Sequence, residues 1–127
     1  MIDAPVSALL AGVFAGMLVM LSGPVSFRRI ATKTSLGEGT DPLLQRLIRT
    51  QGNFTEFVPL GLMALFFVEI GGAGGRQAWI IGGLLLAGRL FHAISMMIGF
   101  KIGRSVGMIL TYASLVTSAV VLIGRAL

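Results

Sequence analysis

The chain has 127 residues, of which 55% are hydrophobic and 12% charged. A soluble domain carries about 25% charged residues. The composition therefore excludes a soluble domain and indicates a single integral membrane domain over residues 1–127. The net charge of +5 does not indicate a nucleic-acid partner, because the basic residues lie at the ends of apolar spans, where anionic membrane lipids explain them. With no Cys, one His and five carboxylates, the sequence offers no cysteine nucleophile and predicts no metal site.

Four long apolar segments alternate with short polar or glycine-rich connections, and each is long enough to cross a bilayer as a helix. The first contains no charged residue. The second begins at Asp41 and Pro42, which are typical of an N-cap and a first helical position. Short connections favour an up-down, all-α bundle of four transmembrane helices. The predicted spans are residues 5–27, 42–70, 77–98 and 104–123.

Positive charge is distributed unequally between the two ends of the predicted bundle. The end that carries the first and third loops holds most of the basic residues, whereas the opposite end holds only Arg76 and Arg125. By the positive-inside rule, loops 1 and 3 are cytoplasmic and both termini lie outside. The basic residues at the cytoplasmic end are Arg28, Arg29, Lys33, Arg46, Arg49, Lys101 and Arg104.

A polar face on the second helix runs directly into its apolar span. Arg46, Arg49, Asn53 and Glu56 are spaced three, four and three residues apart, which places them within a stripe of about 80–100° on one side of a helix. Ionisable groups at membrane depth cost several kcal/mol unless they are paired or hydrated. The stripe is therefore a site hypothesis rather than ordinary surface.

The third helix carries a second polar face that rises toward the same end of the bundle. Arg89, His92 and Met96 follow one another at helical spacing. Together with the second helix, they predict a cytoplasm-facing pocket with apolar walls and a basic floor. Such a pocket suits a small amphipathic anion, because arginine binds carboxylates bidentately, while Glu56 could receive an ammonium group. The residues expected at its rim are Arg28, Arg29 and Arg104.

Simpler explanations remain open for several of these residues. Arg28 and Arg29 could act only as topology determinants. Glu56 and Arg89 could form a buried ion pair between two helices, because an arginine about 14 Å inside a span needs a partner. His92 could be a satisfied interior group rather than a ligand contact.

Arg104 lies at the N-terminus of the fourth helix, where the helix dipole disfavours a cation. Membrane topology alone could place it there. An anion held between the helix N-terminus and the guanidinium would also explain it, and a thiolate is such an anion. Positive charge near a thiol lowers its pKa from about 8.5 and increases the fraction of nucleophile at neutral pH.

Three motifs together resemble the MAPEG family (membrane-associated proteins in eicosanoid and glutathione metabolism). The match depends mainly on QRLIRTQGNFTEFVP, residues 45–59 of the second helix. It is reinforced by GRLFHA at 88–93 and RSVGMILT at 104–111, which look most like bacterial members. The resemblance extends over the whole chain.

This resemblance implies a homotrimer in the inner membrane, with glutathione bound as co-substrate between neighbouring subunits near the cytoplasmic face. Arg104 matches the arginine that stabilises the glutathione thiolate in catalytic members, so it is the expected catalytic residue. A lipophilic co-substrate would arrive through the bilayer. The residues expected to bind glutathione are Arg28, Arg29, Arg49, Gln51, Asn53, Glu56, Arg89 and His92.

The chain departs from the leukotriene-synthesising members of the family, which carry Tyr at the positions of Phe57, His92 and Met96. This departure argues against an eicosanoid synthase. The expected function is a glutathione transferase or peroxidase for lipophilic electrophiles. The alternative is a non-catalytic scaffold that binds lipid or glutathione. A small multidrug exporter ranks last, because such transporters usually carry a carboxylate in the first span.

Overall fold

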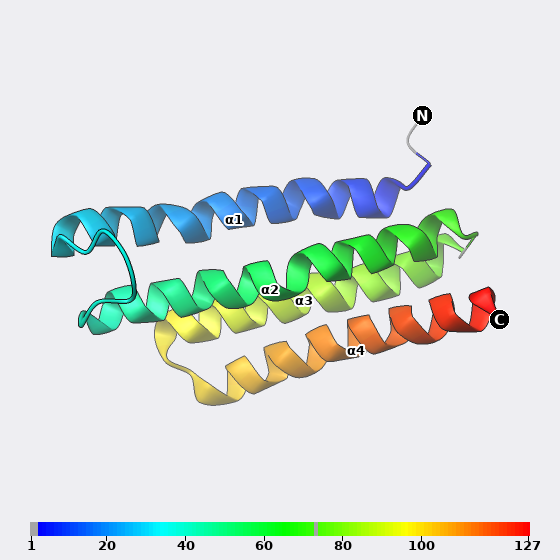
Figure 1. The fold of residues 1–127 in the computed structure, drawn as a ribbon. Helices are drawn as coiled ribbons and strands as arrows, with labels where there is room; N and C mark the ends of the chain where they lie inside the picture. The colour runs from blue at the N-terminus through cyan, green and yellow to red at the C-terminus, as the bar shows by residue number, and fades with distance from the viewer. Residues whose placement is uncertain (1–2, 73) are drawn as a thin grey trace.

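The computed structural model describes residues 3–72 and 74–127, which form four long helices joined by short connections (Figure 1). All four are long and apolar enough to cross a membrane, which confirms the predicted all-α membrane architecture. The first continues past its predicted end at residue 27, through both arginines, because charged side chains at an interface do not interrupt backbone hydrogen bonding. The helices are α1 (Pro5–Thr32), α2 (Pro42–Ile70), α3 (Gly75–Ile98) and α4 (Lys101–Ala126).

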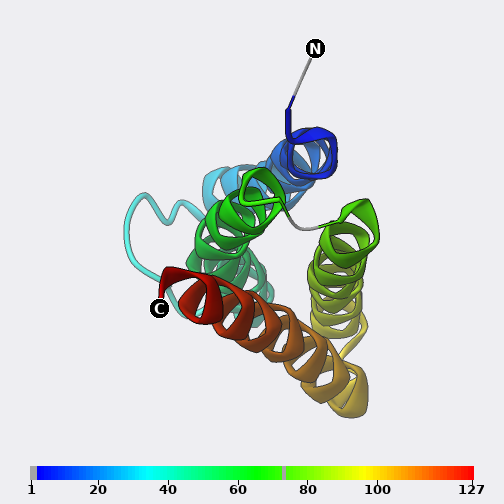
Figure 2. The ribbon, with the colours of Figure 1, turned by 90° about the vertical axis from the view of Figure 1, so that its right-hand side faces the viewer.

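The helices run up and down in chain order. The α1–α2 and α3–α4 connections lie at one end of the bundle, and the start of α1 and the end of α4 lie at the other (Figure 1). Viewed end-on, α1 and α4 lie on opposite sides of the α2–α3 pair (Figure 2). Contacts join α1 to α2 and α3, and α4 to the same two helices, but none joins α1 to α4 within the described part of the chain. The central pair therefore holds the bundle together.

The apolar core fills the space between α1, α2 and α3. Phe14 of α1 and Phe54 of α2 meet edge to face with ring centroids 5.8 Å apart, a favoured geometry for aromatic pairs. Leu65, Ile81 and Leu85 are fully buried beside them. Most of the buried polar residues lie on the other side of the central pair, between α2, α3 and α4.

Two glycines let α3 and α4 cross at backbone contact. A Cβ atom on Gly107 would lie 2.6 Å from the backbone nitrogen of His92 and 2.8 Å from the carbonyl oxygen of Gly88. Nothing but a hydrogen fits there, as at close helix crossings in membranes generally. The crossing fixes the register of α4 against α3, and it thereby fixes the position of Arg104 relative to His92.

A carboxylate from α2 caps the N-terminus of α1. The N-cap residue Ala4 supplies no side-chain hydrogen bond. Instead, Glu69 accepts hydrogen bonds from the backbone nitrogens of Val6 (2.9 Å) and Ser7 (2.8 Å) and from Ser7 Oγ (2.7 Å). A negative group at this position satisfies free N–H groups and complements the helix dipole. Helical periodicity does not predict this contact, because it joins the N-terminus of α1 to the C-terminus of α2, more than 60 residues later in the sequence.

We predict that Gly107→Ala lowers the free energy of unfolding by about 1–3 kcal/mol, because the added methyl overpacks the α3–α4 crossing. Unfolding of the detergent-solubilised protein by a denaturing detergent measures this change. Gly83→Ala is the matched control, since a Cβ there meets nothing within 4 Å. An equal stability for both variants would contradict a backbone contact at Gly107.

Glu69→Gln is expected to lower the free energy of unfolding by about 1–2 kcal/mol, because it weakens charge-assisted hydrogen bonds to the first turn of α1. Glu38→Gln, an exposed loop position, serves as the control for loss of a negative charge. Both are measured in the same unfolding assay. A Glu69→Gln variant as stable as Glu38→Gln would show that the cap contributes nothing.

Candidate functional site

A pocket of about 630 Å³ lies between α2, α3 and α4, at the end of the bundle that carries the α1–α2 and α3–α4 connections (Figure 1). Its polar side is formed by side chains from the first half of α2 and the first turns of α4. Its apolar side is formed by methionines and an isoleucine. The lining residues are Arg49, Asn53, His92, Met96, Arg104, Ser105, Met108 and Ile109.

The pocket is basic. Arg49 and Arg104 both line it and both keep their side chains exposed. No carboxylate is among the lining residues, and the first turn of α4 contains no acidic residue. Within residues 3–72 and 74–127, no group of three or more potential metal ligands comes together. The arrangement therefore suits an anionic organic ligand.

His92 lies in the pocket wall with most of its surface covered. Only 8% of the residue is exposed, and the exposed part lines the pocket. No other group in the described chain hydrogen-bonds to its ring. A polar ring that is nearly buried and open only to a pocket is available to hydrogen-bond with a ligand there.

Arg89 lies behind the pocket rather than in its wall, and only 1% of it is exposed. Its Nε donates to Thr111 Oγ1 at 3.0 Å, and its Nη1 donates to Asn53 Oδ1 at 2.6 Å. Its guanidinium also lies 5.3 Å from the ring centroid of Phe57, a cation–π distance. Neutral acceptors from α2 and α4 thus satisfy this cation.

The ion pair considered between Glu56 and Arg89 does not form. Successive helical residues point about 100° apart. On α2, Asn53 and Phe57 face Arg89, while Glu56 points away and is exposed. In the described part of the chain, the one ion pair is between Arg28 and Asp41.

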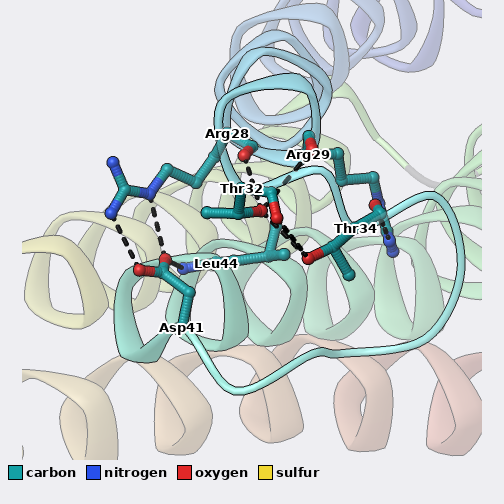
Figure 3. Close-up of polar contacts among 6 residues, drawn as sticks. All are labelled: Arg28, Arg29, Thr32, Thr34, Asp41 and Leu44. Atoms are coloured by element: carbon teal, nitrogen blue, oxygen red, sulfur yellow. Dashed lines mark hydrogen bonds and ion pairs between the residues drawn. The ribbon is translucent and has the colours of Figure 1, made fainter.

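Arg28 and Arg29 hold the first loop instead of lining the pocket (Figure 3). Arg28 makes a bidentate contact with Asp41, with its Nε 2.9 Å from Oδ1 and its Nη2 2.8 Å from Oδ2. Arg29 Nη1 donates to the carbonyl oxygens of Thr34 (3.3 Å) and Gly37 (2.8 Å). Both arginines therefore tie the α1–α2 connection to the end of α1.

The remaining predicted contacts lie on other surfaces of the chain. Gln51 donates from Nε2 to Ser22 Oγ of α1 at 2.7 Å. Glu56 and Arg46 are exposed on the outer side of α2. One chain thus brings together Arg49, Asn53, His92 and Arg104, and leaves Arg28, Arg29, Gln51, Glu56 and Arg89 outside the pocket lining.

The pocket also contains residues of α4 that were not predicted. Ser105, Met108 and Ile109 stand one, four and five positions after Arg104. Residues four apart share a helix face. Helical spacing counted from Arg104 would therefore have identified Met108 as a neighbour in the pocket wall.

Comparisons with known proteins agree with this architecture. The sequence model of the MAPEG family matches residues 7–124. The inner membrane protein YecN of Escherichia coli strain K12 is 38% identical over 87 residues, which cover 68% of this chain and 66% of the relative, just under two thirds of it. YecN of strain O6:H1 matches to the same extent. No solved structure matches the chain.

The contact between Arg28 and Asp41 has a measurable pH dependence. Hydrogen bonds from Arg28, and next from the Leu44 amide, lower the pKa of the Asp41 carboxyl from 3.8 to about 2. A carboxyl whose pKa is lowered by folding stabilises the folded state above its unfolded pKa. We therefore expect this contribution to be complete above about pH 4 and to disappear as the pH falls toward 2.

Carboxyl NMR of aspartate-labelled protein measures this pKa. In Arg28→Gln, the pKa of Asp41 should rise toward its ordinary value, because the largest cause of its lowering is removed. An Asp41 pKa that is the same with and without Arg28 would contradict the contact.

Proposed function

Because the chain belongs to the MAPEG family, we propose that it is a membrane-bound glutathione-dependent transferase or peroxidase acting on lipophilic electrophiles. The observation that carries the proposal is the basic pocket, which two exposed arginines line together and whose lining contains no carboxylate. Glutathione, as co-substrate, would bind through its carboxylates and its thiolate. A volume of about 630 Å³ is within the usual range of small-molecule sites.

Arg104 is the proposed catalytic residue. Its Nη1 contacts Met96 Sδ at 3.5 Å, a weak acceptor, and it takes part in no ion pair of the described residues. The guanidinium is therefore free to hydrogen-bond with a thiolate. It would lower the pKa of the glutathione thiol and so increase the concentration of the nucleophile at neutral pH.

The proposed chemistry begins with attack by this thiolate. With an electrophilic carbon, a sulfur–carbon bond forms and the leaving group departs with its electron pair. With an organic hydroperoxide, the sulfur takes the terminal oxygen, the oxygen–oxygen bond breaks, and the alkoxide leaves and is protonated. A second glutathione then reduces the resulting sulfenic acid and yields the disulfide and water.

The lipophilic partner would enter from the membrane. Met96, Met108 and Ile109 form the apolar side of the pocket, and Ile109 is 65% exposed on the outer surface of α4. An apolar molecule dissolved in the bilayer could reach the thiolate along this surface without crossing water. The pocket therefore offers separate polar and apolar approaches.

A homotrimer would complete the site. Glu56 is exposed about 20 Å along α2 from its start, at a depth where an unpaired carboxylate is costly. A neighbouring subunit, or the ammonium group of a ligand held between subunits, would supply its partner. Arg28, Arg29 and Gln51 could add glutathione contacts only in such an assembly.

The chain would lie in the inner membrane, with loops 1 and 3 on the cytoplasmic side. The relative YecN is named an inner membrane protein, and the excess of basic residues at the loop end supports this orientation. Glutathione would then reach the pocket directly from the cytoplasm.

The second candidate function is binding without turnover, as a lipid- or glutathione-binding scaffold. The contact from Arg104 to the thioether of Met96 favours it, because the pocket presents no phenol hydroxyl at that position. This alternative predicts a retained lipid and no reaction with an activated aryl halide at any glutathione concentration.

Arg104→Ala should reduce glutathione thiolate formation by about 10- to 100-fold, because a hydrogen bond to a charged group contributes about 1.5–3 kcal/mol. Ultraviolet thiolate absorbance of the purified protein, titrated with glutathione, measures it. Lys101→Ala removes a cation from the same end of α4 outside the pocket lining and should have no effect. Wild-type protein without thiolate absorbance at millimolar glutathione would overturn the proposal.

A further inference from the structure

The side-chain amide of Asn53 has a defined orientation. Arg89 Nη1 lies 2.6 Å from the amide atom assigned as Oδ1. A guanidinium has donors only, so the atom that faces it must be the amide oxygen. The amide nitrogen therefore points the other way. Since Asn53 lines the pocket, its N–H₂ group is available to a ligand.

Arg89 is itself held by a series of hydrogen bonds that ends at a backbone carbonyl, which sets which group donates and which accepts in each bond. The hydroxyl of Thr111 donates to the carbonyl oxygen of Gly107 at 2.9 Å. Its oxygen is then left as an acceptor, and both Nε and Nη2 of Arg89 donate to it. The close α3–α4 crossing at Gly107 fixes this carbonyl. The donor and the acceptor of each hydrogen bond in this series are therefore fixed.

We infer that Arg89 is a positioning residue for the pocket. It acts through Asn53, whose amide it turns so that two N–H donors face the ligand, and it makes this wall of the pocket specific for groups that accept hydrogen bonds. Where the ligand is glutathione, this inference rests on the proposed function. It replaces the expectation that Arg89 itself contacts glutathione.

The resulting donor set would favour anionic ligands in the pocket. Arg49 and Arg104, which line the same pocket as Asn53, add guanidinium donors. Anionic acceptors such as carboxylate, sulfonate or thiolate satisfy all three residues, whereas an ammonium group would face donors only. An ammonium group on the same ligand would have to lie outside this wall, in the direction of Glu56.

The test uses the fact that Asn53 is the single asparagine of the chain. Selective ¹⁵N labelling of asparagine therefore gives one pair of side-chain amide resonances, which report on this group alone. We would titrate the labelled full-length protein with glutathione and, separately, with inorganic sulfate. Both probes should shift these resonances in the wild type.

Arg89→Lys keeps the charge but loses the planar fork, so the amide should no longer be held. Both probes should then shift the Asn53 resonances much less, and glutathione affinity should fall at least about ten-fold. Thr111→Ser, which keeps the hydroxyl acceptor, is the control, and its glutathione affinity should stay near that of the wild type. A lysine variant with unchanged resonances and unchanged affinity would overturn the inference.

Asn53→Asp supports the test if Arg89→Lys does not fold. The aspartate keeps an acceptor for Arg89, so the fold should survive, but the donors toward the pocket are lost. Glutathione and sulfate affinity should each fall at least about ten-fold. Gln77→Glu makes the same amide-to-acid change at the opposite end of the bundle and should have no effect. Equal affinity in Asn53→Asp and the wild type would contradict a donor role.

The two proposals fail separately. If sulfate shifts the wild-type Asn53 resonances but glutathione neither shifts them nor binds, the positioning role stands and the glutathione proposal fails. If calorimetry shows glutathione binding while the Asn53 resonances stay unchanged, the positioning role is overturned and the proposed function stands. If neither probe shifts the resonances or binds, the orientation of Asn53 has no role in ligand recognition and the inference is overturned.

Discussion

A guanidinium buried among the membrane-spanning helices is the constraint on which the rest of the structure depends. An unpaired charge at this depth would cost several kcal/mol. Arg89 avoids this cost by donating to Asn53 of α2 and Thr111 of α4, so three helices must keep one register for the cation to be satisfied. The glycine crossing of α3 and α4 brings Thr111 within reach of Arg89. The bond to Asn53 and the α3–α4 crossing hold Asn53 and Arg104 in the lining of one pocket, and packing and recognition are therefore coupled.

The arginines near the loop end of the bundle fall into two groups with different roles. Arg28 and Arg29 bond to their own loop, which ties α1 to the start of α2 and leaves them little capacity for a ligand within one chain. Arg49 and Arg104 line the pocket without an ion-pair partner among the described residues. The positive potential of the pocket comes from this second group. An anion bound there would replace water as the partner of both guanidinium groups.

The helices and much of the pocket could be predicted from the sequence, because both depend on local patterns. Apolar length and the start signal at Asp41 gave the spans, and helical spacing placed Arg49, Asn53 and His92 on facing sides. The partner of Arg89 was not predictable in this way, since Glu56 and Asn53 differ by less than one turn and only the packing angle decides between them. Contacts that join distant segments, such as Glu69 with α1 and Arg28 with Asp41, follow from the path of the chain in space. The proposed trimer and glutathione site rest on family resemblance together with the pocket's charge.

The central claim is that the basic pocket between α2, α3 and α4 is the site of an anionic thiol co-substrate. A structure of the full-length protein in lipid nanodiscs at saturating glutathione, determined by electron cryomicroscopy, tests it most directly. The account predicts ligand density against Arg49 and Asn53, with the sulfur within hydrogen-bonding distance of the Arg104 guanidinium. Ligand density at another place on the protein, or a pocket filled only by water or lipid at saturating glutathione, would contradict it.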